Sequence, residues 1–408
     1  MKKKLTKSKL IVVFIVILVL FAPLSINLPK QTDSRAFIIG VGVDKGEDDG
    51  YILSAQVLVP ESEQIFKETL QVYSSEGKNI LECVEHMSLH FGKIAGFGNV
   101  SVIVFGSDMA KEGIIPTLDF FMRSSRLNDN ATIVTTNKKA KDLLQAVSDI
   151  DKSFSYSINN LSKLNTETAI SHSTNMSEFM GRYYGISKAS FVSQIRLEQD
   201  DNLGIDTKGQ PGNSTTQSSS QSQNSSQDSV VSNNGYTSVF VDGKEIDVFG
   251  PEQLVGFENI SSGIRGAYSI ENVSDEYINN ADVDMSIKNR IRRVEYKFKN
   301  GIPQVYYHLR YTVKVENIRE DGNNLILDGT KNYVSKEVKN KFKQLIQSQV
   351  AESINLSKQY NADVLNIQNE FFKYKNKDWK KYYAKLPDKS EAYKNIEFFL
   401  DVEVDGIV

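Results

Sequence analysis

One glutamate and two histidines, Glu82, His86 and His90, follow one another at intervals of four residues. The surrounding residues 77–91 have apolar side chains at helical spacing and predict an amphipathic helix. Residues four apart lie on the same side of a helix, so the three polar side chains would form one stripe. Because imidazole nitrogens and carboxylate oxygens bind zinc, the stripe is a candidate metal site.

Two features of the sequence argue against zinc. In zinc peptidases a glutamate directly follows the first histidine of the motif, whereas here Glu85 precedes His86. A zinc site needs a third or fourth ligand, and the other histidines, His172 and His308, are remote in the sequence. We therefore favour a solvent-exposed polar helix face, expect no cofactor, and keep a zinc-dependent enzyme as an alternative.

Strands and helices alternate around this stretch. The apolar runs 99–105 and 131–136 predict buried strands, and residues 116–123 between them predict a helix. Residues 334–360 predict the longest helix, because their apolar residues form one continuous stripe. The fold class expected is α+β, with about three packed α/β subdomains and mixed sheets.

Two arginines follow the predicted helix 116–123. Arg123 and Arg126 can contact carboxylates of a partner protein, or they can complement the negative end of that helix. The second interpretation is the simpler one, so both residues are only possible partner contacts.

The first 28 residues combine a cluster of lysines with an apolar run. Five lysines lie among residues 2–9, and residues 10–22 carry no charge. Export machinery reads this arrangement, which predicts that the rest of the chain lies outside the cytoplasm. Residues 1–28 are either a cleaved signal peptide or a retained membrane anchor, and the apolar length that extends to Leu28 favours the anchor.

Composition limits the remaining function classes. A formal net charge of -3 over 408 residues argues against a nucleic-acid-binding protein, which would carry a basic excess. Cys83 is the one cysteine, so an intramolecular disulfide is impossible and core packing must stabilise the fold. Because Cys83 lies at helical spacing among apolar residues, we expect a buried, inert thiol.

A polar tract divides the chain. Residues 210–234 are almost entirely Ser, Gln, Asn, Gly and Thr, a composition that cannot bury enough apolar surface to offset the entropy of ordering. The domains expected are therefore 33–200 and 236–408, joined by a disordered linker over residues 201–235.

Catalytic signatures are not apparent in the sequence. It contains no serine-histidine-acid, nucleophile-elbow or phosphate-loop spacing. An aromatic cluster near the end of the chain is more typical of core packing than of a binding face. Its members are Phe371, Phe372, Tyr374 and Trp379.

Several blocks, in order, resemble the Ger(x)C family, the C-subunit type of nutrient germinant receptors in endospore-forming bacteria. The opening strand 33–44, with its Gly40-x-Gly42-x-Asp44 ending, is similar to the family's first strand, and residues 99–126 are similar to its most recognisable block. Residues 253–257 resemble the start of the C-terminal domain, and residues 359–364 resemble the motif that follows the long helix.

The resemblance implies a non-enzymatic α+β protein of about three packed domains. It also implies a place at the outer face of the spore inner membrane, beside two integral-membrane partners, the A- and B-type subunits. Family members usually carry a lipid-modified cysteine after the apolar run, whereas this chain has Pro23, Leu24 and Ser25 there. No lipid attachment is therefore expected, and residues 1–28 become the candidate membrane attachment. An extracytoplasmic ligand-binding module unrelated to germination remains the alternative.

Overall fold

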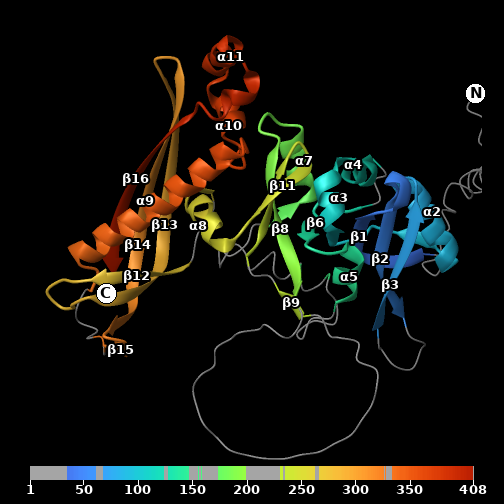
Figure 1. The fold of residues 1–408 in the computed structure, drawn as a ribbon, viewed down its shortest axis with the longest axis horizontal. Helices are drawn as coiled ribbons and strands as arrows, with labels where there is room; N and C mark the ends of the chain where they lie inside the picture. The colour runs from blue at the N-terminus through green and yellow to red at the C-terminus, as the bar shows by residue number, and fades with distance from the viewer. Residues whose placement is uncertain are drawn as a thin grey trace, which may run out of the picture.

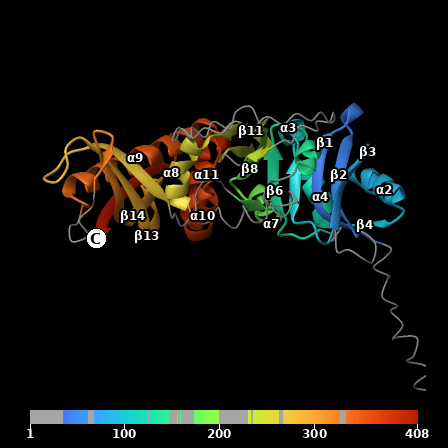
Figure 2. The same cartoon turned by 90° about the horizontal axis from the view of Figure 1, so that it is seen from below.

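The computed structural model describes residues 35–60, 68–123, 127–146, 155, 158, 173–198, 230–232, 235–261, 266–325, 327 and 333–407. Two β-sheets organise these residues, one in each half of the chain (Figure 1). Between the sheets lie helices α8 (Pro251–Ser261), α10 (Ile367–Tyr374) and α11 (Asn376–Lys385), as the two perpendicular views show (Figures 1 and 2).

The N-terminal sheet is mixed, with the spatial order β11-β10-β8-β6-β5-β1-β2-β3. Its strands are β1 (Arg35–Lys45), β2 (Tyr51–Pro60), β3 (Glu68–Gly77), β5 (Val102–Phe105), β6 (Thr132–Thr136), β8 (Ala189–Glu198), β10 (Thr237–Val241) and β11 (Lys244–Phe249), with β4 (Ile94–Gly96), β7 (Thr174–Asn175) and β9 (Val230–Ser232) paired beside them. The central strands β1, β5, β6 and β8 are parallel, and β5 and β6 are buried along their whole length. Both are the buried strands that their apolar sequences predicted.

Helices cover both faces of this sheet. They are α2 (Ile80–Phe91), α3 (Ser107–Glu112), α4 (Ile115–Arg123), α5 (Ala140–Gln145) and α7 (Met176–Tyr183). Alternate residues of β5 belong to separate cores, because successive side chains of a strand point to opposite faces. Ile103 and Phe105 join the larger core with α2 and α4, whereas Val102 and Val104 join a smaller core with α5.

The end of β1 packs against the start of α5. A Cβ on Gly42 would lie 3.0 Å from the Cβ of Ala140, so the glycine allows this short helix to approach the strand. Asp44 then accepts the backbone N–H groups of Ala140 at 2.7 Å and of Lys141 at 3.1 Å, at the start of α5. Burial raises the pKa of the Asp44 carboxyl, although these two donors oppose the shift. The Gly-x-Gly-x-Asp pattern therefore serves helix packing and capping.

The C-terminal sheet is a long hairpin with flanking strands. Strands β13 (Ala281–Lys299) and β14 (Ile302–Glu320) pair antiparallel, joined by Asn300 and Gly301 in left-handed backbone conformation, as a tight hairpin turn requires. Strand β12 (Ala267–Val273) flanks β13; β15 (Asn323–Asn324) pairs antiparallel and β16 (Glu397–Ile407) parallel with β14. Helix α9 (Lys336–Gln359) packs its apolar stripe on this sheet, where the second core forms.

The described residues form two sheets, and the expected number of subdomains stays a prediction. Residues 237–249, which follow the polar tract in the sequence, form the hairpin of β10 and β11. In the structure β10 pairs antiparallel with β8, so this hairpin extends the N-terminal sheet. The chain consequently leaves the first sheet after Phe249 and enters the second through α8.

Two helices begin later than their sequence patterns suggested. Helix α2 starts at Ile80 because β3 continues to Gly77, and Asn79 caps it by accepting the N–H of Glu82 at 3.0 Å. Helix α9 occupies 336–359 within the predicted 334–360, with Ser335 as its cap. Among the described residues no helix is both long and apolar enough to cross a membrane, and the predicted segment 1–28 lies outside them.

Candidate functional site

The three candidate zinc ligands lie on α2, but each has a different partner. The Glu82 carboxylate accepts the backbone N–H just before the helix at 2.8 Å. Nδ1 of His86 lies 2.8 Å from the carbonyl oxygen of Glu76, and the ring of His90 packs against Tyr73 with centroids 5.5 Å apart. Within the described part of the chain, no three His, Cys, Asp or Glu residues are grouped to hold a metal ion. Two of the three contacts attach α2 to β3.

Of the two arginines considered as partner contacts, Arg123 is the last residue of α4 and Arg126 follows three residues later in the sequence. Arg123 is exposed and pairs with Asp119 one turn earlier on the same helix, with its Nε 2.8 Å from Oδ2. The ion pair raises the pKa of the Arg123 guanidinium through that hydrogen bond. Arg126 lies outside the described residues. A role of either arginine in partner binding stays a prediction.

The aromatic cluster near the end of the chain divides into buried and exposed members. Phe371 is fully buried and Trp379 is 2% exposed, and their rings stack with centroids 5.5 Å apart. Phe372 and Tyr374 are 39% and 58% exposed. Core packing therefore accounts for only the first two, and the other two present aromatic surface beside them.

The motif 359–364 forms the turn between α9 and α10. Asp363 is completely buried in this turn and accepts the backbone N–H groups of Ile367 and Gln368, each at 2.8 Å. It therefore caps α10 from outside the helix, because Asn366, at the formal cap position, has a left-handed backbone and makes no side-chain cap. Burial raises the pKa of the Asp363 carboxyl to about 6.

Side chains of the N-terminal half hold this turn. Arg182 of α7 donates from Nη1 to the carbonyl oxygen of Val364 at 2.5 Å and pairs through Nη2 with Glu178 at 2.9 Å. The Ser187 hydroxyl donates to the side-chain oxygen of Asn366 at 2.8 Å. The turn after the long helix is thus the place where the two halves are bonded to each other.

A cavity of about 360 Å³ opens at the same junction. Arg182 from the N-terminal half and Arg292 and Glu370 from the C-terminal half line it, together with aromatic rings. Arg292 uses its guanidinium to cap α8, donating to the carbonyl oxygen of Ile260 at 2.8 Å, and Arg182 is bonded as described. Much of the charge in this cavity therefore already stabilises the junction.

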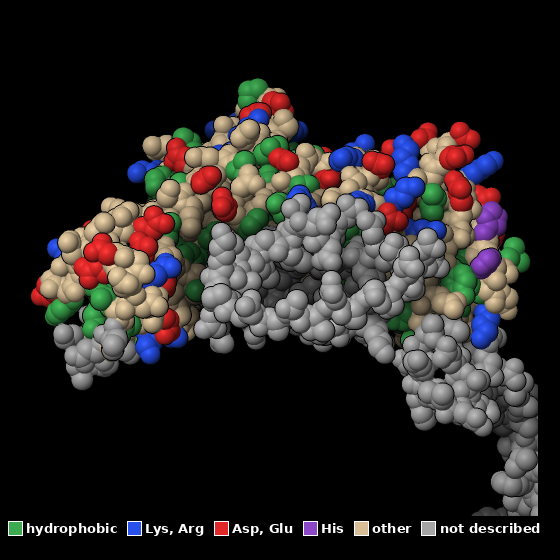
Figure 3. Space-filling model, turned by 60° about the horizontal axis from the view of Figure 1, so that its bottom comes forward, with side chains coloured by type: hydrophobic (Ala, Val, Ile, Leu, Met, Phe, Trp, Pro, Cys, Tyr) green, Lys and Arg blue, Asp and Glu red, His purple; other side chains and the backbone are tan. Residues whose placement is uncertain are grey.

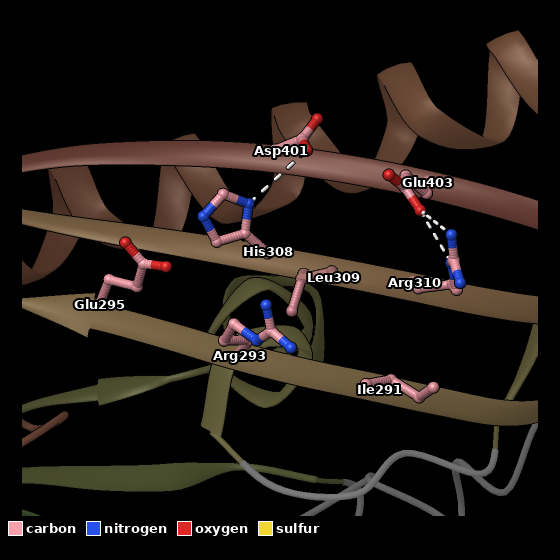
Figure 4. A pocket seen from close by; sticks show the side chains of 8 residues that line it. All are labelled: Ile291, Arg293, Glu295, His308, Leu309, Arg310, Asp401 and Glu403. Carbon is pink, nitrogen blue, oxygen red and sulfur yellow. Dashed lines mark hydrogen bonds and ion pairs between the residues drawn. The ribbon is translucent and has the colours of Figure 1, made fainter.

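A second, shallower depression of about 420 Å³ lies on the face of the C-terminal sheet that carries polar side chains (Figure 4). Side chains of β14 and β16 meet across it: Nδ1 of His308 lies 3.6 Å from the Asp401 carboxylate, and Arg310 pairs with Glu403 at 2.6 Å (Figure 4). Both contacts are largely exposed to solvent, where such pairs add little to stability. On the face of the molecule drawn in Figure 3, lysine, arginine and acidic side chains are interspersed among the other side chains.

Sequence reasoning missed the structural acids and the arginine at the junction. Asp44 lies near glycines, but the helix that it caps begins elsewhere in the chain. Asp363 lies near asparagines, and the helix that it caps begins after a residue with a left-handed backbone. A capping signal could have identified Asp363, which precedes α10 by four residues. No local signal marks Arg182, because its acceptor is 182 residues away.

Comparison with known proteins gives concordant matches along the chain. The model for the spore germination protein N-terminal domain matches residues 29–197, and the model described as spore germination B3/GerAC like, C-terminal matches residues 236–405. Spore germination protein KC of Bacillus subtilis (strain 168) is 29% identical over an alignment of 149 residues, and the match covers 33% of this chain. The match spans 37% of that relative's length.

The fold also has a solved counterpart. The crystal structure of the GerBC protein superposes with a TM-score of 0.51 at 13% sequence identity, covering 91% of this chain and 98% of that chain. Identity at this level supports the fold alone, whereas the two family models, in order, cover most of the chain. The chain belongs to the Ger(x)C family of spore germination proteins.

Proposed function

We propose that this protein is a non-enzymatic, membrane-associated subunit of a spore nutrient germinant receptor. It acts beside A- and B-type integral-membrane subunits at the extracytoplasmic face of the spore inner membrane. The ordered match of both germination-protein domains over residues 29–197 and 236–405 carries the proposal. The lysine cluster and apolar run of residues 1–28 support a membrane attachment that needs no lipid.

The roles of the buried acids support a non-enzymatic function. Asp44 and Asp363 both use their carboxylates to accept backbone N–H groups at helix starts. Catalytic acids and bases need a proton partner in an accessible site, whereas these two groups are engaged inside the fold. The chain would then contribute surfaces and a rigid junction to the receptor. In this proposal residues 33–200 and 236–408 are the two functional domains, joined by the linker 201–235.

The junction cavity favours a second candidate function. A cleft of about 360 Å³ lined by both halves suits a small ligand, which is the property of an extracytoplasmic ligand-binding module unrelated to germination. Such a module would not depend on membrane partners.

Co-purification from spores separates the two candidates. An epitope-tagged chain is isolated from gently solubilised spore membranes, and associated proteins are identified by mass spectrometry. We expect two integral-membrane proteins to accompany the chain. The control variant replaces residues 1–28 with a cleavable signal peptide, and we expect its release from the membrane when the partners are removed. Recovery of the unmodified chain without any integral-membrane protein would favour the ligand-binding module.

A further inference from the structure

A third cavity, of about 420 Å³, lies where the end of α7 meets α10 and α11. The loop 185–188 forms the wall from the N-terminal half, and α10 and α11 form the wall from the C-terminal half. Figures 1 and 2 show α10 and α11 on the side of the C-terminal sheet that faces the N-terminal half. The cavity is separate from the junction cavity, with which it shares no lining residue.

Aromatic rings form one wall of this cavity. Trp379 lines it and is held in a stack, with its ring centroid 5.5 Å from Phe371 and 6.3 Å from Tyr383. Tyr383 and the partly exposed Phe372 complete the wall. Trp379 itself is 2% exposed, so the rings of Tyr383 and Phe372, which pack beside it, supply the accessible apolar surface of the wall.

Three lysines surround the aromatic wall. Nζ of Lys380 lies 5.7 Å from the ring centroid of Phe372, and Nζ of Lys389 lies 5.6 Å from that of Tyr383. Within the described residues, no carboxylate lies within ion-pair distance of Lys380 or Lys389. Each ammonium group therefore lies beside an aromatic ring and remains available to pair with an anion. The third lysine, Lys188, pairs with Asp242 at 3.0 Å.

Residues 373–389, which carry two of these lysines, are strongly basic. They contain seven lysines and two aspartates. A local excess of one sign of charge raises the concentration of oppositely charged ligands near a cleft. Cations are correspondingly disfavoured.

The opposite wall is held in a fixed conformation. Lys188 has a left-handed backbone, with φ of 50°, which is unusual for a residue with a side chain. Its carbonyl oxygen accepts the N–H of Asp242 at 2.9 Å, and the neighbouring Ser187 is bonded to Asn366 of the other half. The two walls therefore keep their separation without a ligand, which reduces the entropy that binding must offset.

From this arrangement we propose that the cavity binds a small organic anion with a planar apolar body, such as an aromatic carboxylate. The rings of Tyr383 and Phe372 contact the flat body, and the ammonium groups of Lys380 and Lys389 pair with the anionic group. The inference goes beyond the receptor assignment and does not depend on it, because it rests on the cavity alone.

Fluorescence of Trp379 tests the proposal directly, because it is the one tryptophan of the chain and it lines the cavity. The full chain, in a neutral detergent without aromatic groups, is titrated with benzoate and separately with benzamide. The two probes share a ring, and only benzoate is charged. We expect benzoate to quench Trp379 with a saturable curve and benzamide to bind at least about tenfold more weakly.

Matched variants assign the charge effect to the cavity. Lys380→Gln combined with Lys389→Gln is expected to weaken benzoate binding by about tenfold. The control, Lys381→Gln combined with Lys385→Gln, removes the same charge from exposed positions of α11 that do not line the cavity, and is expected to change affinity less than about twofold. Equal binding of benzoate and benzamide, equal loss in both double variants, or no saturable quenching up to about 10 mM benzoate would each overturn the proposal.

Discussion

Replacing Gly256 with valine is expected to prevent the C-terminal half from folding correctly. Gly256 lies in α8 where this helix crosses α9, and a Cβ on it would lie 2.0 Å from the carbonyl oxygen of Gln349 and 2.3 Å from Oγ of Ser353. The Ser353 hydroxyl also donates to the carbonyl oxygen of Gln253 at 2.9 Å, so the two helices are bonded at this crossing. A larger side chain must separate them.

The expected cost of the valine exceeds about 3 kcal/mol, because overpacking against backbone adds to the loss of the helix-helix contact. The measurement is the yield of soluble full-length chain and its thermal unfolding followed by circular dichroism. The matched control is Gly181→Val in α7, where a new Cβ meets no atom within 4 Å and the expected change is below about 1 kcal/mol. A Gly256→Val protein that unfolds at the same temperature as this control would show that the helices do not need the glycine.

The second large effect is a pH dependence that originates at Asp363. Burial raises the pKa of its carboxyl from 3.8 to about 6, since desolvation outweighs the two N–H donors and the nearby charge of Arg182. The folded state therefore holds the proton more tightly than the unfolded state. The contribution of Asp363 to the free energy of unfolding is fully present below about pH 4 and is lost as the pH rises through about 6. A difference of two pKa units corresponds to roughly 3 kcal/mol.

Asp363→Asn removes this titration while keeping the shape and one acceptor. From pH 4 to pH 7, we expect the free energy of unfolding of the original chain to fall by roughly 3 kcal/mol relative to that of the variant. Denaturant unfolding at pH 4, 5, 6 and 7 measures it. Asp388→Asn is the control: hydrogen bonds from Ser390 lower the pKa of this exposed carboxyl, so its contribution is lost as the pH falls. A stability difference for Asp363→Asn that does not change with pH would contradict the buried-carboxylate account.

Local patterns in the sequence predicted individual elements well, because each pattern reports burial along one element. The long stripe of 334–360 is helix α9, and the apolar runs 99–105 and 131–136 contain β5 and β6. The Gly40-x-Gly42 pattern lies inside β1, which continues to Lys45 and is followed by strand β2. What those glycines do depends on α5, about 100 residues later.

The arrangement of the elements was less predictable. The pairing of β8 with β10 joins strands on either side of residues 199–229, and nothing in either strand's own sequence specifies that partner. The aromatic cluster was expected to be core, yet Phe372 and Tyr374 are exposed neighbours of the buried Phe371. On a short helix, adjacent residues point in different directions, so one apolar run serves both a core and a surface. Only the tertiary structure brings Phe372 and Lys380 to the same cavity as the loop 185–188.

Germination of spores that lack this gene tests the central claim most directly. Spores of the deletion strain, in a background without a paralogous gene, are exposed to nutrient germinants, and loss of refractility is followed over time. The account predicts that at least one nutrient response is lost, that the original chain restores it, and that Gly256→Val does not, whereas Gly181→Val does. An unchanged response to every nutrient in the deletion strain would contradict the assignment to a germinant receptor.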